Sequence, residues 1–433
     1  MTDLGYAPHD DFGHIVQSPP RETLRPADAA GVAAAIRDAV RRGLRVAARG
    51  LGHSQYGQAQ APDGLVIETR AMRQVRISGG AAIAGGGATW REVLEAALPH
   101  GLVPPVLTDY LDLTVGGTLS AGGFGGQTSR YGTQADNVDE LEVVIGDGRI
   151  VRCSARQEPE LFHAVRAGLG RFGVITEARL RLVPAPGLVR EHTLGYPDPY
   201  ALVAAQLELL HEPRVTYLEG QVMWTERGWG YELEATTGDE DPPPAPGRPS
   251  GTVTEAWTPY GFADRMAPDV AQLTELGAWD APHPWLTLLL PGSTAAGFVA
   301  ATMAEMGPED LGIGVILLYP VRTALIAVPQ LRLPHEPVAF MFAVLRTATP
   351  EARTVTDLLA ANRILYERAR AIGGTRYPVD AVPFTAADQA SHDRPVGPRM
   401  TAWRNAFDPA GILAPGLRQE TGDPGQAGRP TSA

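Results

Sequence analysis

The chain has 433 residues, of which 44% are hydrophobic and 20% charged, which is typical of a soluble globular protein with enough apolar material for a large core. Its formal net charge of −12 argues against nucleic acid or an anionic membrane as a partner, because phosphate groups are bound by basic surfaces. The sequence contains no lysine, which excludes Schiff-base enzymes, pyridoxal-phosphate enzymes and Walker A nucleotide sites.

The single cysteine, Cys153, excludes an internal disulfide, a cysteine-rich zinc site and an iron–sulfur cluster. We predict no metal site. The amino-terminal residues lack the apolar stretch of a signal peptide, and no run of about 18 apolar residues is present. We therefore expect a cytoplasmic protein that has no membrane span.

The first half of the chain alternates short helices, short strands and glycine-rich loops. Asp28 is suited to cap a helix that Gly43 ends, and Val32, Ile36 and Val40 share one face of it. After this helix we expect strands over residues 44–48, 64–69 and 81–85, a helix over 90–98, a hairpin with strands over 140–145 and 149–153, a helix over 161–166 and a strand over 174–183. The pattern predicts an α+β region.

Residues 114–126, TVGGTLSAGGFGG, stand apart from these elements. Glycine permits positive φ angles and close approach of the backbone to a ligand. We expect no regular element in this segment.

A boundary is expected at residues 184–188. Beyond it we predict strands over 215–224, 230–237, 314–318 and 338–345 and helices over 294–305 and 352–372. These elements predict a sheet covered by helices. The acidic, proline-rich residues 238–250 and the polar residues 419–433 are predicted to be disordered.

The strongest local signal for chemistry is RGLGHSQYGQ, residues 49–58. A strand that ends in a Gly-x-Gly turn presents backbone N–H groups that can bind pyrophosphate without lysine. Ser54 does not fit a nucleophile elbow, and the glycine spacing does not fit the Rossmann fingerprint. From the local pattern alone, His53 is more often an ordinary loop histidine than a functional one.

Asp109 has apolar neighbours on both sides in the sequence. A carboxyl group that is buried in an apolar setting can act as a proton acceptor. An aspartate that caps a turn has the same local pattern, and spacing alone favours that role. Residues 168–176, GLGRFGVIT, fit either close packing on a flat ring or a tight turn into a strand.

Four segments of the first half follow one another with compatible spacing: RGLGHS, TDYLDLTVGGTLSAGG, GTQADNVDELEVVIGDGRIV and EPELFHAVRAGLGRFGVITEARL. Together they resemble the PCMH-type FAD-binding domain of the vanillyl-alcohol oxidase superfamily, and most of all the cytokinin dehydrogenases. The resemblance spans residues 20–185 and returns at residues 407–418, FDPAGILAPGLR. It is weak in the middle region.

The resemblance implies a two-domain α+β fold. Its parts would be an FAD-binding domain at residues 1–188, a substrate-binding cap of a sheet and helices at 189–390, a carboxyl-terminal return to the FAD domain at 391–418, and the tail at 419–433.

The resemblance also implies a covalent bond between His53 and the 8α-methyl carbon of FAD. A second bond through cysteine is not expected, because Cys153 lies in the predicted hairpin. Further FAD contacts are implied for Arg49, Gly50, Gly52, Ser54, Gln58, Thr114, Gly117, Ser120, Val174, Ile175 and Tyr377. Leu417 stands where the family usually has a glutamine that contacts the flavin.

For catalysis, the resemblance implies that Asp109 is the general base that accepts a proton as hydride leaves for flavin N5. It makes Glu234 a residue that holds the substrate ring, although an exposed strand carboxylate is an equal alternative.

The expected function is an FAD-linked oxidoreductase that removes hydride from a C–N or C–O bond of a small molecule. The substrate would be a cytokinin-like amine or a bacterial secondary metabolite, and the weak match of the cap favours the second. The acceptor of electrons, oxygen or a quinone-like carrier, and the oligomeric state stay open. Alternatives are a non-covalent NADPH-dependent flavin reductase and a non-catalytic flavin-binding paralogue.

Overall fold

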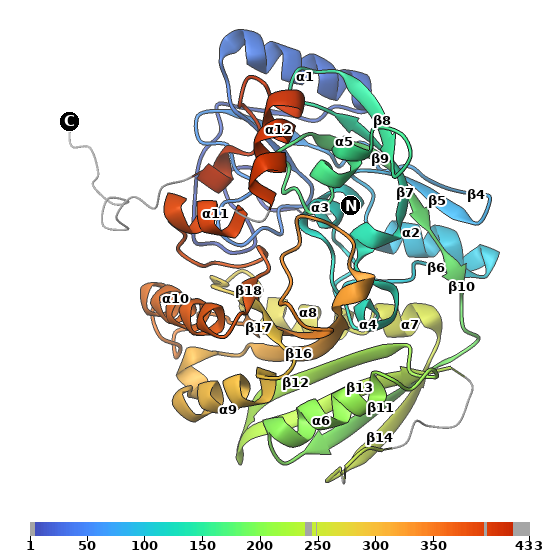
Figure 1. The fold of residues 1–433 in the computed structure, drawn as a ribbon, viewed down its shortest axis with the longest axis vertical. Coiled ribbons are helices and arrows are strands. Elements are labelled where there is room, and N and C mark those ends of the chain that lie inside the picture. The colour runs from blue at the N-terminus through green and yellow to red at the C-terminus, as the bar shows by residue number, and fades with distance from the viewer. Residues whose placement is uncertain (1–4, 239–244, 248, 394–395, 419–433) are drawn as a thin grey trace.

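A computed structural model describes residues 5–238, 245–247, 249–393 and 396–418. The predicted disordered tail at 419–433 and much of the acidic, proline-rich segment lie outside the described residues. The chain is arranged in two parts: the elements up to β10 lie with α11 and α12 at one end, and a large sheet with its helices lies at the other (Figure 1).

The first part begins with a small parallel sheet in the order β1-β3-β2, against which α1 packs. Its elements are β1 (Glu22–Leu24), α1 (Ala29–Arg42), β2 (Val46–Arg49) and β3 (Leu65–Glu68). The predicted ends of α1 are confirmed, since Asp28 accepts a hydrogen bond from the Gly31 N–H and Gly43 adopts φ of 64°. Of the three residues predicted to share one face, Val32 and Ile36 are fully buried and Val40 is 40% exposed.

Next comes an antiparallel five-stranded sheet in the order β4-β5-β9-β7-β8. Its strands are β4 (Val75–Ser78), β5 (Ala81–Gly85), β7 (Val138–Val144), β8 (Ile150–Ser154) and β9 (Val174–Arg181), and its neighbours are α2 (Trp90–Ala97), β6 (Leu102–Val103), α4 (Thr128–Tyr131), α5 (Pro159–Val165) and β10 (Val183–Pro184). Most of the predicted strands and the hairpin are confirmed; β4 was missed.

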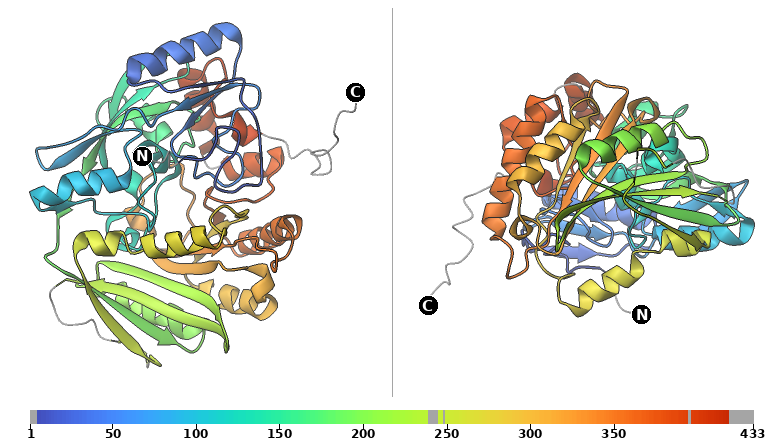
Figure 2. Two further views of the ribbon diagram at one scale, coloured as in Figure 1. Left: turned by 180° about the vertical axis from the view of Figure 1, so that it is seen from behind. Right: turned by 90° about the horizontal axis from the view of Figure 1, so that it is seen from below.

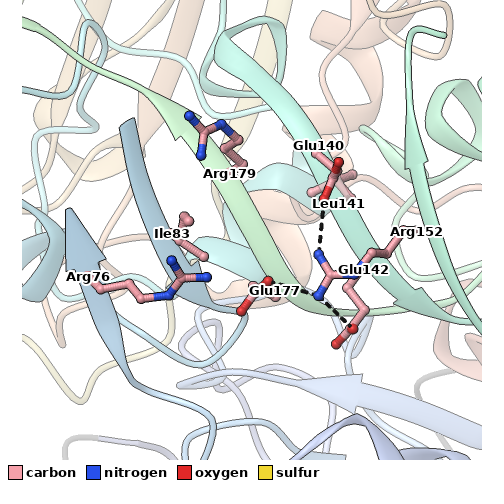
Figure 3. A pocket seen from close by; sticks show the side chains of 8 residues that line it. All are labelled: Arg76, Ile83, Glu140, Leu141, Glu142, Arg152, Glu177 and Arg179. Carbon is pink, nitrogen blue, oxygen red and sulfur yellow. Dashed lines mark hydrogen bonds and ion pairs between the residues drawn. The ribbon is translucent and has the colours of Figure 1, made fainter. Parts of the chain in front are cut away.

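Side chains alternate between the two faces of this sheet. Ala178 and Leu180 of β9 belong to the core, whereas Glu177 and Arg179 face outward. The outer face carries a hollow of about 320 Å³ in which Arg152 pairs with three glutamates (Figure 3). None of the predicted site residues lines it.

The prediction that residues 114–126 form no regular element is wrong, because Val115–Ala121 is the helix α3. The Thr114 hydroxyl caps α3 by accepting a hydrogen bond from the Gly117 N–H at 3.3 Å. Its glycine content reflects packing: a Cβ on Gly116 would lie 2.8 Å from the carbonyl oxygen of Gly86. Tertiary packing therefore outweighs low helix propensity here.

The cap is an antiparallel eight-stranded sheet in the order β14-β11-β13-β12-β16-β17-β15-β18. Its strands are β11 (Val189–Tyr196), β12 (Tyr217–Thr225), β13 (Gly228–Thr237), β14 (Thr252–Trp257), β15 (Leu286–Pro291), β16 (Val315–Arg322), β17 (Val338–Leu345) and β18 (Thr375–Arg376). The sequence analysis did not predict β11, β14, β15 or the two-residue strand β18.

Helices α6 (Pro199–Leu209), α9 (Ala295–Glu305) and α10 (Val355–Ala371) pack on one face of the cap sheet, and Figure 2 shows α6 and α9 along that side. Residues of β16 alternate between the two faces of the sheet: Leu318 packs with these helices, whereas Tyr319 joins the core of the first part. The other face of the cap sheet is therefore turned toward the first part. Helices α7 (Pro259–Ala263) and α8 (Ala267–Glu275) follow β14.

After the cap, α11 (Ala386–Asp393) and α12 (Gly397–Phe407) lead back to the first part. There the Val46 N–H donates to the Ile412 carbonyl at 2.8 Å and the Ala414 N–H donates to the Val46 carbonyl at 2.9 Å. Across the described ranges, no helix is both long and apolar enough to cross a membrane.

Candidate active site

The loop after β2 and the start of α3 meet through glycines. A Cβ on Gly50 would lie 2.0 Å from the Thr114 hydroxyl oxygen, and Gly117 lies against the same oxygen. Gly52 has φ of 80°, and a Cβ there would lie 2.2 Å from Arg49 Nη2. The structure therefore brings together Arg49, Gly50, Gly52, Thr114 and Gly117, five of the residues for which the resemblance implies FAD contacts.

Several buried polar atoms around this loop have no hydrogen-bond partner among the described residues. They are Nδ1 and Nε2 of His53, Nη1 of Arg49, Oδ1 of Asp11, and Oε1 of Gln55 and Gln60. Buried polar groups are nearly always paired in folded proteins. A cluster of unpaired donors and acceptors beside a glycine-lined loop fits a polar cofactor such as FAD.

The His53 imidazole is held in its neutral form. Burial lowers its pKa to about 3, and the positive charge of Arg49 and the nearby His283 act in the same direction. Its ring lies 5.0 Å from the ring of Tyr110, measured between centroids. The loop that carries His53 is therefore adjacent to the loop that carries Asp109.

Three predicted contact residues use their side chains within the protein. Ser54 Oγ donates to Asp11 Oδ2 at 2.9 Å, and Ser120 Oγ donates to the Gly116 carbonyl at 2.7 Å. Gln58 Oε1 accepts from two backbone N–H groups of its own loop, and its Nε2 donates to the Asp380 carbonyl at 3.0 Å. These side chains shape the loop and the helix.

Val174 and Ile175 begin β9, next to α3. A Cβ on Gly86 would lie 2.1 Å from the Ile175 carbonyl oxygen, while the Gly86 carbonyl accepts from the Gly116 N–H at 2.8 Å. Gly86 thus links the start of β9 to α3.

Tyr377 approaches the same region from the cap. Its hydroxyl accepts a hydrogen bond from the Gly123 N–H at 3.2 Å, and its ring packs edge-on against Phe124. Burial raises the pKa of Tyr377 above its usual range. From the carboxyl-terminal segment, Gly416 lies against the loop: a Cβ there would be 2.1 Å from the Gly57 carbonyl oxygen. Leu417, the next residue, is partly buried.

Asp109 belongs to a charged cluster, so the expected apolar setting is wrong. Its Oδ1 accepts hydrogen bonds from Arg265 Nη2 at 2.8 Å and from the Tyr217 hydroxyl at 3.0 Å. Its side chain is 24% exposed. The second oxygen, Oδ2, accepts no hydrogen bond within the part of the chain that the structure describes, and so is available to an incoming proton donor.

Glu234 lies in the same cluster. Its Oε2 is 3.9 Å from Arg265 Nη2 and its Oε1 accepts from Gln221. The alternative of an exposed strand carboxylate is wrong, because the side chain is only 15% exposed. Burial raises the pKa of Glu234 to about 7, against the opposing charge of Arg265.

Sequence reasoning missed Tyr217, Glu219 and Arg265. Glu219 is 1% exposed, its Oε2 is buried without a partner in the described chain, and burial raises its pKa well above the usual range. It stands directly opposite Glu234 in the pairing of β12 with β13. A glutamate in the apolar run YLEGQV was the available signal for Glu219; nothing in the sequence near Arg265 pointed to Asp109, which lies 156 residues earlier.

Comparison with known families gives two matches. Residues 20–154 match the family described as FAD binding domain, and residues 252–419 match the family described as cytokinin dehydrogenase 1, FAD and cytokinin binding. The second match covers much of the cap, where the sequence motifs were weak.

Individual relatives match along almost the whole chain. An uncharacterised oxidoreductase, ORF5 of the fasciation locus of Rhodococcoides fascians, is 38% identical over 94% of this chain and 95% of its own length. Cytokinin dehydrogenase 9 of Oryza sativa subsp. japonica is 33% identical over 94% of this chain and 87% of its own length.

Solved structures of two oxidases share the fold of this chain. The 6-hydroxy-D-nicotine oxidase of Arthrobacter nicotinovorans superposes with a TM-score of 0.71 at 21% identity, covering 95% of this chain and 93% of that one. A chitooligosaccharide oxidase gives 0.73 at 16% identity, with 94% and 92% covered. The expected two-domain flavoprotein fold is confirmed, and the chain belongs to the cytokinin dehydrogenase family of FAD-dependent oxidoreductases.

Proposed function

We propose that this oxidoreductase oxidises a C–N bond in a cytokinin-like amine, with FAD bound covalently through His53 and Asp109 as the general base. When bound, FAD supplies the acceptor for the hydride. The observation that carries the proposal is the position of Asp109, which lies between the loop of residues 49–58, here called the flavin loop, and the cap carboxyl groups of Glu219 and Glu234. The names of the relatives and the cytokinin-binding match support the substrate class.

Asp109 is prepared for proton transfer by its two neighbours. Arg265 and Tyr217 both hold Oδ1, so the carboxylate has a fixed orientation and Oδ2 is the oxygen that takes the amine proton. A general base must lie within hydrogen-bond reach of its proton, and positioning contributes a large part of its effect.

Glu219 and Glu234 are suited to recognise a heteroaromatic ring. Two carboxylates directly opposite each other on neighbouring strands repel, and burial raises the pKa of both. One of them therefore carries a proton near neutral pH and donates a hydrogen bond, while the other accepts one. A ring with a nitrogen acceptor beside an N–H donor, such as adenine, satisfies both.

We assign the contacts with FAD to residues of the loop after β2, of α3, of β9 and of the cap that lie close together in the structure. We assign the pyrophosphate to the backbone N–H groups of residues 50–54 and the edge of the flavin to Tyr377 and the start of β9. Leu417 offers no hydrogen bond from its side chain, so the polar contact of a glutamine at this position is lost. We keep the domain limits 1–188, 189–390 and 391–418 as part of this proposal.

Anaerobic mixing tests the proposal. A cytokinin should bleach the flavin absorbance within a single turnover. Oxygen or a quinone is then added to separate samples, and the oxidant that restores the flavin absorbance faster is identified as the electron acceptor. A secondary alcohol of similar shape and NADPH serve as comparison reductants. Bleaching by the alcohol alone would move the activity to C–O bonds, and rapid bleaching by NADPH without any response to the amine would assign a flavin reductase.

Acid precipitation of the protein tests the covalent bond separately. The yellow colour should remain with the precipitate, and a peptide mass should place FAD on the His53 peptide. Release of all flavin into the supernatant would contradict attachment but leave amine oxidation standing.

A further inference from the structure

The segment of residues 5–18, here called the strap, lies before the matched FAD-binding family region, which begins at residue 20. Its backbone nevertheless pairs with the flavin loop on both sides of His53. The Phe12 N–H donates to the Gly52 carbonyl at 2.9 Å, and the Gly13 N–H donates to the Ser54 carbonyl at 3.3 Å.

Side chains fasten the strap to this loop. Asp11, which is fully buried, accepts from Ser54 Oγ at 2.9 Å and from the Gly57 N–H at 2.7 Å. In return, Arg49 Nη2 donates to the strap carbonyls of Tyr6 and Ala7.

The approach is close enough to require glycine in the strap. A Cβ on Gly13 would lie 1.8 Å from the carbonyl oxygen of Gln55. The strap and the loop are therefore fitted to each other rather than loosely apposed.

Phe12 covers one face of the His53 imidazole. The two rings are stacked, with centroids 5.2 Å apart and planes at 17°. Phe12 is 1% exposed and is itself stacked on His283, at 4.2 Å and 8°. Tyr6 contacts the edge of His53 at 5.5 Å between centroids.

This packing replaces the usual means of orienting a reactive histidine. Such a histidine commonly has one ring nitrogen hydrogen-bonded, which fixes its tautomer and its plane. Neither ring nitrogen of His53 has a partner in the described chain. The plane of the imidazole is therefore set by the rings of Phe12, Tyr6 and Tyr110.

We propose that the strap is a positioning element for attachment of FAD, in which Phe12 holds the plane of the His53 imidazole and Asp11 holds the loop that carries it. The inference rests on the proposed bond to His53. That bond joins a ring nitrogen to the 8α carbon of FAD. The methyl group and the imidazole N–H each lose one hydrogen, which together amount to two protons and two electrons, and dioxygen takes up these two protons and two electrons to become hydrogen peroxide.

The test follows attachment directly. Protein prepared without flavin is mixed with FAD in air, and intact mass under denaturing conditions gives the fraction that carries the adduct with time. Phe12→Leu should slow attachment by roughly tenfold or more, because a small misplacement of a reacting group has effects of this size. The affinity for non-covalently bound FAD, measured by the quenching of FAD fluorescence, should change little.

Phe298→Leu is the matched control, since Phe298 packs on Phe342 in the cap, and it should attach FAD at the wild-type rate. Asp11→Ala is the second variant, and it should also slow attachment. It tests the role of the strap even if Phe12→Leu fails to fold. Wild-type rates in both strap variants would overturn the role of the strap while the bond to His53 stands. His53→Ala should carry no adduct. If the wild-type protein also carries none, the proposed bond to His53 is wrong and the inference about the strap is wrong with it.

Discussion

The flavin loop and the charged cluster around Asp109 are adjacent but are built in opposite ways. The loop brings residues 49–58 together from a single stretch of chain, and its polar atoms include several without partners. The cluster draws Asp109, Tyr217, Glu234 and Arg265 from distant positions, and its main charges are paired within the protein. The unpaired polar atoms of the loop fit a bound cofactor, whereas the paired charges of the cluster fit the role that we propose for it, which is to hold a general base.

The largest effect is expected at the base itself. Asp109→Asn keeps the shape of the side chain but removes the proton acceptor, so flavin reduction by substrate should slow by about 10²- to 10⁴-fold while FAD loading stays normal. Stopped-flow absorbance under anaerobic conditions measures the rate. Asp112→Asn is the control, because Asp112 lies on the same loop but pairs with Arg91. Equal rates in Asp109→Asn and wild type would remove Asp109 from the mechanism.

The second effect concerns Arg265, the positive charge that Asp109, Glu219 and Glu234 share. Arg265→Gln leaves Asp109 and two buried glutamates without their positive partner, so flavin reduction should slow by roughly 10- to 100-fold and the rising limb of its pH profile should move to higher pH. Arg265→Lys should recover part of both.

Arg152→Gln provides the comparison for Arg265, since Arg152 pairs with three glutamates on the outer face of the five-stranded sheet. It should leave the pH profile in place. A loss of rate in Arg265→Gln without any shift of the profile would limit Arg265 to a structural role.

The contrast between loop and cluster also explains what the sequence could predict. The ends of α1 were predictable because Asp28 and Gly43 act through local backbone geometry. The loop was recognisable for the same reason, although His53 alone resembled any loop histidine. The helix α3 was missed because its glycines serve packing against Gly86, which only the tertiary structure reveals.

The surroundings of Asp109 were not predictable from its neighbours in the chain. Local sequence placed it among apolar residues, but folding brings Arg265 and Tyr217 to its Oδ1. The opposed pair of Glu219 and Glu234 depends on the register of β12 with β13, and register is a property of the sheet rather than of either strand.

A smaller effect is expected for the stability of the cluster. The pKa of Glu234 is raised from 4.5 to about 7 by burial, with Arg265 opposing and Glu191, Asp109 and Glu232 reinforcing the shift. The folded protein thus holds a proton that the unfolded chain releases between these values, so the stability from this group is full below pH 4.5 and is lost as the pH rises toward 7.

Glu234→Gln removes this dependence. Its free energy of unfolding relative to wild type should rise by roughly 1–3 kcal/mol between pH 5 and pH 8, measured by urea denaturation at each pH. Glu232→Gln, two residues earlier on the same face of β13, removes one of the charges that reinforce the shift and should therefore reduce the trend without abolishing it. A constant difference between Glu234→Gln and wild type across this range would place the titrating proton elsewhere in the cluster.

The smallest expected effect distinguishes two contributions of Thr114, which caps α3 and also contacts the flavin loop. Thr114 and Asp28 both cap helices, accepting hydrogen bonds from the Gly117 and Gly31 N–H groups respectively. Thr114→Ala and Asp28→Ala should therefore each lower the free energy of unfolding by about 1 kcal/mol.

Only Thr114 lies against Gly50 of the flavin loop, so only Thr114→Ala should also weaken non-covalent FAD binding, measured in the His53→Ala background. Equal FAD affinities in the two variants would mean that the loop keeps its shape without α3, and the cradle would then be a property of residues 49–58 and the strap alone.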